Sequence, residues 1–272
     1  MISVPTTRVS RRQALAGAAS ALLLTSCLDR KVGGLVPRDR KRHGHELTDE
    51  PGRLRARPRH SEVGTSPPGL QPIALEAGRD GLVYVPAGYR PDRPAPMVLM
   101  LHGAGGNALG GLDPLVRLAD EAGLILLAPD SRGRNWDLIV GGYGPDVAFI
   151  DRALAQAFAR YAVDEQRIAV EGFSDGASYA LSLGMVNGDL FSHVIAFSPG
   201  FAARGTTQGS PDFFISHGIR DPVLPIDSSS RRIVPRLRRA GYVVRYQEFD
   251  GGHVVPPEVA LQAVTWFVNG GG

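Results

Sequence analysis

From about residue 70 onward, short apolar runs alternate with longer stretches in which apolar residues recur every three or four positions. Short apolar runs predict β-strands, and the three-and-four spacing predicts amphipathic helices. The predicted strands are Leu82–Val85, Met97–Leu101, Leu124–Ala128, Ile168–Val170, Val194–Phe197, Phe213–Ser216 and Val243–Phe249. The predicted helices are Leu112–Glu121, Asp146–Tyr161, Gly176–Val186, Ser229–Ala240 and Pro257–Val268.

Strands that alternate with helices indicate right-handed crossovers and a mostly parallel sheet with helices on both faces. We therefore predict an α/β fold for residues 69–272 as one domain. The stretch between Phe197 and Phe213 is too short to hold a helical cap, so we expect an open site. In sheets of this kind, ligand sites gather at the C-terminal ends of the strands.

Residues 1–27 have the layout of an export signal. Arg11 and Arg12 precede an apolar run, Ala14 to Leu24, that is shorter than the roughly 20 residues needed to span a bilayer. The segment SRRQAL resembles the twin-arginine signal for export of folded proteins, with an ordinary Sec signal as the alternative. We predict an exported protein.

The apolar run ends in LTSC, and its Cys27 is the only cysteine of the chain. A cysteine without a partner forms no internal disulfide. The tetrapeptide resembles a bacterial lipobox, which implies lipidation of Cys27 and an anchor on the outer face of the membrane. The alternative is an unmodified apolar residue near a cleavage site.

Residues 28–68 are rich in Arg, Pro and Gly and have no apolar periodicity, which is typical of a disordered basic linker. Three histidines lie in it, His43, His45 and His60. We interpret them as part of a solvated tether rather than as a metal site, and we predict no metal.

The charge of the chain is unevenly distributed. The formal net charge is +3, but residues 1–68 hold 13 basic and 6 acidic residues and the remainder holds 17 and 21. The predicted domain is thus mildly acidic, which argues against a nucleic-acid partner.

Three polar residues follow predicted strands in an order that indicates nucleophilic chemistry. Ser174 lies in GFSDG between a strand and a helix, which is the context of a nucleophile on a tight turn. Asp221 follows the strand DFFISHG, and His253 follows VVRYQEF. A serine hydroxyl needs a base to remove its proton, and the base needs an acid to orient it. We predict that Ser174, His253 and Asp221 fill these roles.

Other residues compete for two of these roles. His102, His193 and His217 are rival bases, but only His253 lies in a loop after the last predicted strand. Asp227 and Asp250 are rival acids, because Asp227 lies close to Asp221 in sequence and Asp250 lies close to His253.

Backbone groups and one aromatic residue complete the predicted site. The amides of Asp175, after the nucleophile, and of Ala104, in the loop HGAGG, are the predicted oxyanion donors, with Gly105 as the alternative to Ala104. Trp136 is a candidate pocket residue, with a rim residue or a packing residue as the alternative.

The motifs HGAGG, GFSDGAS, SHGIRDPVLP and FDGGHVVPPE together resemble the phospholipase/carboxylesterase branch of the α/β-hydrolases, over residues 72–269. The resemblance implies a hydrolase of carboxylic esters that needs no cofactor. We expect short-acyl or exposed bulky esters, small or polymeric, as substrates. Polyhydroxyalkanoate depolymerase or feruloyl-type esterase are alternative enzymes. A non-catalytic binding protein on this scaffold is the alternative from another class.

Overall fold

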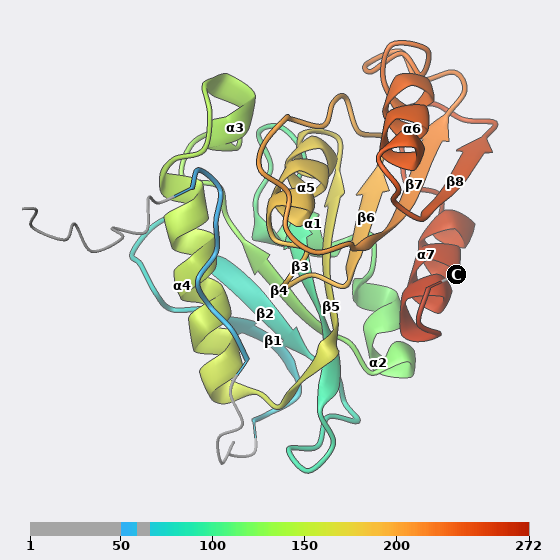
Figure 1. The fold of residues 1–272 in the computed structure, drawn as a ribbon. Coiled ribbons are helices and arrows are strands. Elements are labelled where there is room, and N and C mark those ends of the chain that lie inside the picture. The colour runs from blue at the N-terminus through green and yellow to red at the C-terminus, as the bar shows by residue number, and fades with distance from the viewer. Residues whose placement is uncertain (1–49, 59–65, 272) are drawn as a thin grey trace, which may run out of the picture. The chain divides into compact units, whose positions relative to one another are not determined.

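The computed structural model describes residues 50–58 and 66–271. Within these ranges the chain forms one eight-stranded sheet (Figure 1) of order β1-β2-β4-β3-β5-β6-β7-β8. The first two pairings are antiparallel and the other five are parallel. The strands are β1 (Gly69–Pro72), β2 (Gly81–Val85), β3 (Ala95–Leu101), β4 (Ile125–Pro129), β5 (Val163–Phe173), β6 (His193–Phe197), β7 (Asp212–Gly218) and β8 (Val244–Phe249).

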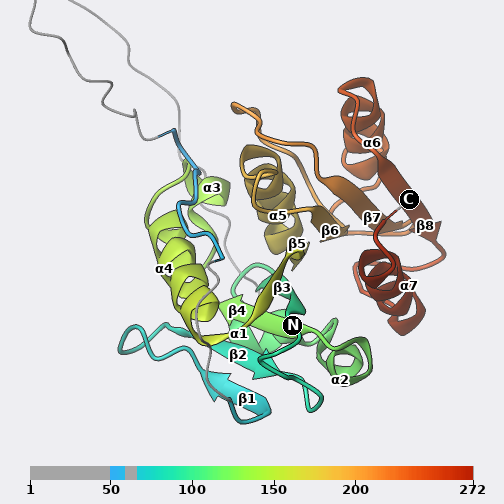
Figure 2. The same cartoon turned by 60° about the horizontal axis from the view of Figure 1, so that its bottom comes forward.

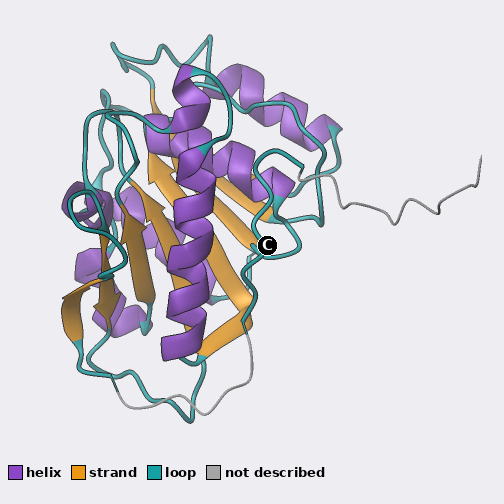
Figure 3. Ribbon diagram, turned by 90° about the vertical axis from the view of Figure 1, so that its left-hand side faces the viewer, coloured by secondary structure: helices purple, strands orange, loops and turns teal. Residues whose placement is uncertain are grey.

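Helices cover both faces of the sheet (Figures 2 and 3). One apolar core joins the sheet to α4, α5 and α6, and the other joins it to α1, α2 and α7. Successive residues of β3 alternate between the two cores, with Leu99 in the first and Val98 in the second. The helices are α1 (Ala108–Leu112), the short 3-10 helix η1 (Val116–Leu118), α2 (Ala119–Ala122), α3 (Asp137–Val140), α4 (Pro145–Arg160), α5 (Asp175–Val186), α6 (Ser230–Arg239) and α7 (Pro257–Val268).

The predicted fold class is confirmed, and one predicted helix is wrong. The stretch Leu112–Glu121 is not continuous, because α1 ends at Leu112 and two short helices follow after Pro114. Proline has no amide hydrogen to donate, so a regular α-helical hydrogen-bond pattern cannot continue through Pro114. Asp113 and Pro114, at this break, line a cavity together with Leu101 of β3 and Phe173 of β5.

The segment between β6 and β7 leaves the C-terminal edge of the sheet uncapped. Residues 198–211 contain no helix. Among the described residues, no helix is long and apolar enough to cross a membrane. In the described part of the chain, the segment between β6 and β7 therefore places no helix over the C-terminal ends of the parallel strands.

Residues 50–58, called the strap below, pack against the domain. The guanidinium of Arg53 donates to the carbonyl oxygen of Val186 (2.6 Å) and to the carboxylate of Asp189 (2.7 Å). The amide of Leu54 donates to Oδ1 of Asn187 (2.8 Å), and the Leu54 side chain is buried. Hydrogen bonding to Arg53 lowers the pKa of Asp189 below its usual range. The strap is thus bound just after the C-terminal end of α5.

The strap also contacts α4, beside which it runs in Figure 1. Oδ1 of Asp151 accepts hydrogen bonds from the amides of Arg55 (2.7 Å) and Ala56 (2.8 Å). The prediction of a disordered linker over 28–68 is therefore wrong for residues 50–58. Partners more than ninety positions away in sequence bind this segment, and local composition carries no information about them. The predicted signal and Cys27 lie outside the described residues.

Glu171 is a buried acid in the centre of the sheet. It lies on β5 opposite Met100 of β3 and Ile195 of β6, both fully buried. Its side chain is fully buried, and neither carboxyl oxygen has a hydrogen-bond partner among the described residues. Burial raises the pKa of Glu171 well above its ordinary value. An apolar site disfavours the charged form, so the carboxyl is held neutral.

We expect Glu171→Met to remove a pH dependence of stability. In the wild type the pKa of Glu171 is higher in the folded than in the unfolded state, where it is about 4.3. Stability is therefore full below the unfolded value and falls as pH rises toward the folded one, by about 1.4 kcal/mol per pH unit. Urea unfolding at a series of pH values should show the free energies of the two proteins diverging as pH rises. Exposed Glu121→Met is the control, and parallel curves for Glu171→Met would refute the prediction.

Candidate active site

Ser174 lies on a strained turn between β5 and α5. Its backbone has φ 58° and ψ −117°, a left-handed conformation that is unfavourable for a residue with a side chain. The amide of Ser174 donates to the carbonyl oxygen of Phe197 on β6 (2.9 Å), which ties the turn to the neighbouring strand. The surrounding structure thus holds the hydroxyl at the C-terminal end of β5.

The two glycines of GFSDG are required by close backbone approach. A Cβ on Gly172 would lie 2.2 Å from the carbonyl carbon and oxygen of Gly176. A Cβ on Gly176 would lie 2.0 Å from the carbonyl oxygen of Leu101 on β3. Both distances are shorter than any side chain tolerates, so only glycine allows the strand and helix to meet this closely.

The structure brings Ser174, His253 and Asp221 together from the ends of β5, β8 and β7. Nε2 of His253 lies 2.9 Å from Oγ of Ser174, and Nδ1 lies 2.6 Å from Oδ2 of Asp221. An ionised carboxylate can only accept, so Nδ1 carries the proton and donates to Asp221. Nε2 is then free to accept the hydroxyl proton of Ser174, which is the arrangement required to activate a serine.

Asp221 is buried and held at both oxygens. Oδ1 accepts hydrogen bonds from the amides of Val223 (2.8 Å) and Leu224 (2.9 Å), and Oδ2 faces His253. Burial on its own would raise the pKa of Asp221, but the hydrogen bonds from Leu224, His253 and Val223 outweigh it and lower the pKa. The carboxylate therefore stays charged beside the imidazole.

The side chains of the two rival acids pair with arginines and not with His253. Asp250 is exposed and pairs with Arg220. Asp227 is also exposed and pairs with Arg231 at 2.8 Å. Of the three aspartates considered, only Asp221 contacts His253.

His217 supports Asp221, a contact that the sequence did not reveal. Its Nε2 lies 2.8 Å from the carbonyl oxygen of Leu224 and 3.2 Å from Oδ2 of Asp221, and both partners are acceptors. Nε2 therefore carries the proton, and Nδ1 accepts from the hydroxyl of Ser230 (2.7 Å). Burial lowers the pKa of His217, which keeps the ring neutral. The motif SHGIRD, with a histidine four positions before the acid, was the available signal.

The other two histidines are structural. Nε2 of His102 accepts from the amide of Ser131 (3.1 Å), so Nδ1 is protonated and donates to the carbonyl oxygen of Gly103 (2.7 Å). His193 is buried, and its ring packs edge-on against Trp266 and Phe267. Neither ring is hydrogen-bonded to Ser174.

Trp136 is a packing residue in the interior of the domain. The side chain is fully buried, its indole N–H donates to the carbonyl oxygen of His102 (2.8 Å), and its ring packs against the rings of His102 and Tyr179. Trp136 therefore stabilises the loop after β3 through this hydrogen bond. Its role is packing, which was the alternative to a pocket residue.

Two backbone amides near Ser174 are available as oxyanion donors. The amide of Gly105 donates to the carbonyl oxygen of Arg134 (2.9 Å), which removes Gly105 as the alternative to Ala104. Within residues 50–58 and 66–271, the amides of Ala104 and Asp175 have no protein acceptor. The loop containing Ala104 lies beside Ser174, since a Cβ on Gly103 would be 3.6 Å from Cβ of Ser174.

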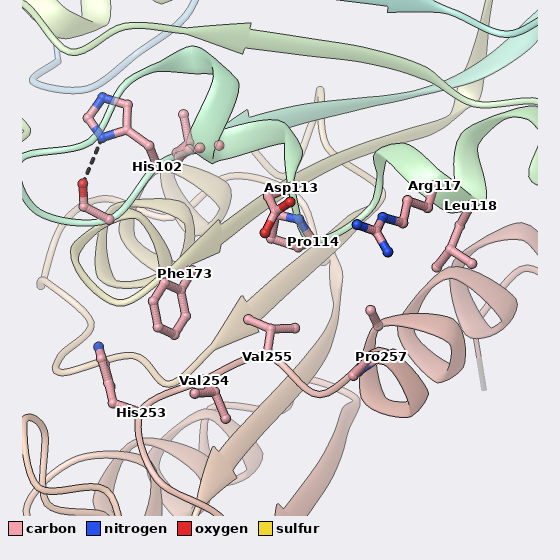
Figure 4. Close-up of a pocket in the computed structure, with 15 residues that line it drawn as sticks. His102, Asp113, Pro114, Arg117, Leu118, Phe173, His253, Val254, Val255 and Pro257 are labelled. Atoms are coloured by element: carbon pink, nitrogen blue, oxygen red, sulfur yellow. Dashed lines mark hydrogen bonds between the residues drawn. The ribbon is translucent and has the colours of Figure 1, made fainter.

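A cavity of about 720 Å³ begins at His253 and runs between α1–η1 and the N-terminal end of α7 (Figure 4). Phe173, Val254 and Val255 form apolar walls close to His253, and Asp113 and Arg117 lie farther along it. The ring of Phe173 packs against that of His253, with centroids 4.6 Å apart. Among the described residues, no group of three His, Cys, Asp or Glu could hold a metal ion.

Parts of this chain are similar in sequence to known proteins. Residues 147–269 match the phospholipase/carboxylesterase family. Feruloyl esterase C of Emericella nidulans is 30% identical over 158 residues, which are 55% of this chain and 57% of that protein. The chain thus matches little more than half the length of this relative.

Two solved structures share the fold. FphF, a fluorophosphonate-binding serine hydrolase of Staphylococcus aureus, superposes with a TM-score of 0.61 at 16% identity, covering 75% of this chain and all of that one. Esterase 2 of Thermogutta terrifontis superposes with a TM-score of 0.60 at 18% identity, covering 80% and 97%. The chain therefore has the α/β-hydrolase fold, and its residues 147–269 match the phospholipase/carboxylesterase family.

Proposed function

We propose that this protein is a carboxylic-ester hydrolase that works through Ser174, His253 and Asp221. The observation that carries the proposal is the continuous hydrogen-bonded chain from Oγ of Ser174 through His253 to Asp221. A scaffold kept only for binding has no physical need for this arrangement. A fluorophosphonate probe should label the protein at Ser174, identified by peptide mass, and absence of labelling would favour the non-catalytic alternative.

The proposed mechanism follows from the positions of the atoms. His253 takes the proton of Ser174 as Oγ attacks the ester carbonyl carbon, and Asp221 stabilises the imidazolium that forms. The amides of Ala104 and Asp175 donate to the oxyanion of the tetrahedral intermediate. His253 then protonates the leaving alcohol, and water releases the acyl group from Ser174 by the same steps. Apart from the ester and water, these reaction steps use only the three side chains and the two backbone amides.

Among esterases, a feruloyl-type enzyme is the second candidate. The name of the Emericella nidulans relative supports it, as does an uncapped edge that admits a bulky acyl group. Residues 198–211 contain no helix, so this segment supplies no helical cap to cover a long flexible acyl chain.

We expect short acyl chains to be preferred over long ones. Each buried methylene contributes only about 0.8 kcal/mol, and an open site buries few of them. With aryl esters of increasing acyl length, kcat/KM should be highest from acetyl to butyryl and low for palmitoyl, without a jump at a lipid interface. Hydroxycinnamoyl esters in the same panel test the feruloyl-type candidate. Sharp interfacial activation on long-chain triglycerides would contradict the open site.

We also infer from the sequence that residues 1–27 direct export and that Cys27 receives the lipid anchor. Acyl chains on Cys27 add about 0.8 kcal/mol of membrane affinity per buried CH₂, so several chains together hold firmly. In a bacterium with the lipoprotein pathway, the wild type should partition with membranes and into detergent. Cys27→Ser should be soluble or remain an unprocessed precursor, and a wild type with an unmodified N-terminus would refute the inference.

A further inference from the structure

We infer that the cavity beside His253 binds the alcohol part of the ester, and that Asp113 and Arg117 select alcohols that are neutral and carry several hydroxyl groups. The inference rests on the proposed function, because it names the substrate class of that same site. It concerns the half of the substrate that leaves first.

The position of the cavity identifies which half of the ester it binds. His253 lines it and Ser174 does not. The imidazole that takes the serine proton later gives it to the leaving oxygen, so the leaving group must lie on the His253 side of the reacting carbon. The acyl group stays on Ser174 and extends toward the uncapped edge. The cavity is therefore placed for the alcohol.

The volume and the walls indicate the size and the polarity of that alcohol. About 720 Å³ lies within the range of small-molecule sites and far exceeds the needs of a methyl group. Close to His253 the walls are apolar, formed by Phe173, Val254 and Val255, so carbon atoms next to the ester oxygen lie against carbon. Polar groups of the alcohol must reach farther along the cavity to find partners.

Asp113 and Arg117 are those partners. They follow α1 and lie four positions apart, and Figure 4 shows both side chains at the same part of the cavity. Many arginines of the domain pair with carboxylates, among them Arg132 with Glu76 and Arg231 with Glu248. In the part of the chain that the structure describes, the side chains of Asp113 and Arg117 have neither a hydrogen bond nor an ion pair.

The two opposite charges together disfavour alcohols that carry a single charge. An anionic group attracted by Arg117 meets the carboxylate of Asp113, and a cationic group attracted by Asp113 meets the guanidinium. Hydroxyl groups satisfy both, because one can donate to Asp113 while another accepts from Arg117. A glycerol-like or sugar-like alcohol has this chemistry. Such an alcohol also presents carbon to the apolar walls.

The experiment compares four butyrate esters that differ only in the alcohol: methyl, glyceryl, choline and carboxymethyl. Wild-type kcat/KM should be highest for the glyceryl ester, with the difference residing mainly in KM. Asp113→Ala and Arg117→Ala should each lower the ratio of kcat/KM for glyceryl over methyl butyrate by about tenfold, as expected for loss of a charged hydrogen bond. Arg117→Lys should restore part of the ratio, and exposed Arg239→Ala on α6 should leave it at the wild-type value. All variants should retain the wild-type melting temperature, because both side chains are exposed.

The outcomes separate the inference from the proposed function. Hydrolysis of the esters with an unchanged glyceryl-to-methyl ratio in both alanine variants would overturn the inference and leave the proposed function standing. A preference for the choline or carboxymethyl ester would overturn the neutral-polyol class in the same way. If the wild type hydrolysed none of the four esters and resisted the fluorophosphonate, the proposed function would fall and the inference with it.

Discussion

Ser174→Ala is expected to lower kcat for ester hydrolysis by roughly 10⁴- to 10⁶-fold, while the protein stays folded. Oγ is the atom that His253 Nε2 contacts at 2.9 Å, and alanine removes it without adding bulk to the turn. The remaining amides at Ala104 and Asp175 can still polarise a carbonyl, which is why activity above the uncatalysed rate should persist. Burst kinetics and steady-state turnover on a short-chain aryl ester would measure the loss.

Ser174→Gly is the matched variant that separates chemistry from backbone strain. Glycine has no Cβ, so it adopts a φ of 58° without steric strain. This variant should be as inactive as Ser174→Ala and should melt at a higher temperature than Ser174→Ala. Activity within tenfold of the wild type in either variant would remove Ser174 from the role of nucleophile.

Asp221→Asn should be the next most damaging change, lowering kcat by about 10⁴-fold. The asparagine amide can donate to Nδ1 of His253, which shifts the imidazole proton to Nε2 and blocks acceptance of the serine proton. The side-chain oxygen of the asparagine can still accept the hydrogen bonds from the amides of Val223 and Leu224, so the loop should keep its shape. Steady-state kinetics with a melting curve would distinguish loss of chemistry from loss of fold.

Asp250→Asn and Asp227→Asn are the controls for this change. Both side chains are exposed and pair with arginines, and surface pairs of this kind contribute little to stability. Each variant should keep kcat within about threefold of the wild type, because loss of a weak surface pair leaves the protein folded and neither side chain contacts His253. If Asp250→Asn proved far worse than Asp221→Asn, the acid would have to be reassigned.

The fold and the positions of Ser174, Asp221 and His253 could be predicted because they follow from local patterns. Alternation of apolar runs identified the parallel strands, and the residues after those strands must meet at one edge of the sheet. Gly172 and Gly176 fit the same local pattern, since a serine turn between a strand and a helix leaves no room for side chains.

Other features could not be predicted, because they depend on contacts between distant residues. Trp136 lies in a loop, where sequence gives no periodicity from which to judge burial, and it is fully buried. Glu171 reads as a polar position, yet its neighbours Met100 and Ile195 come from other strands and enclose it. His217 acts through Asp221, and this contact depends on how the loop after β7 turns back.

The strap changes how the domain bears mechanical force. β1 lies at the edge of the sheet with β2 as its sole neighbour in the sheet, and a pull on an edge strand breaks its hydrogen bonds one after another. A pull applied at residue 50 would first reach Arg53 and Leu54, because their bonds to Asp189 and Asn187 precede β1 in the chain. These bonds lie just past the end of α5 that is opposite Ser174, because the helix begins directly after the serine. A tension applied to the chain before residue 50 would therefore load the bonds of Arg53 and Leu54 before it reached β1, and at a place away from the strained turn at Ser174.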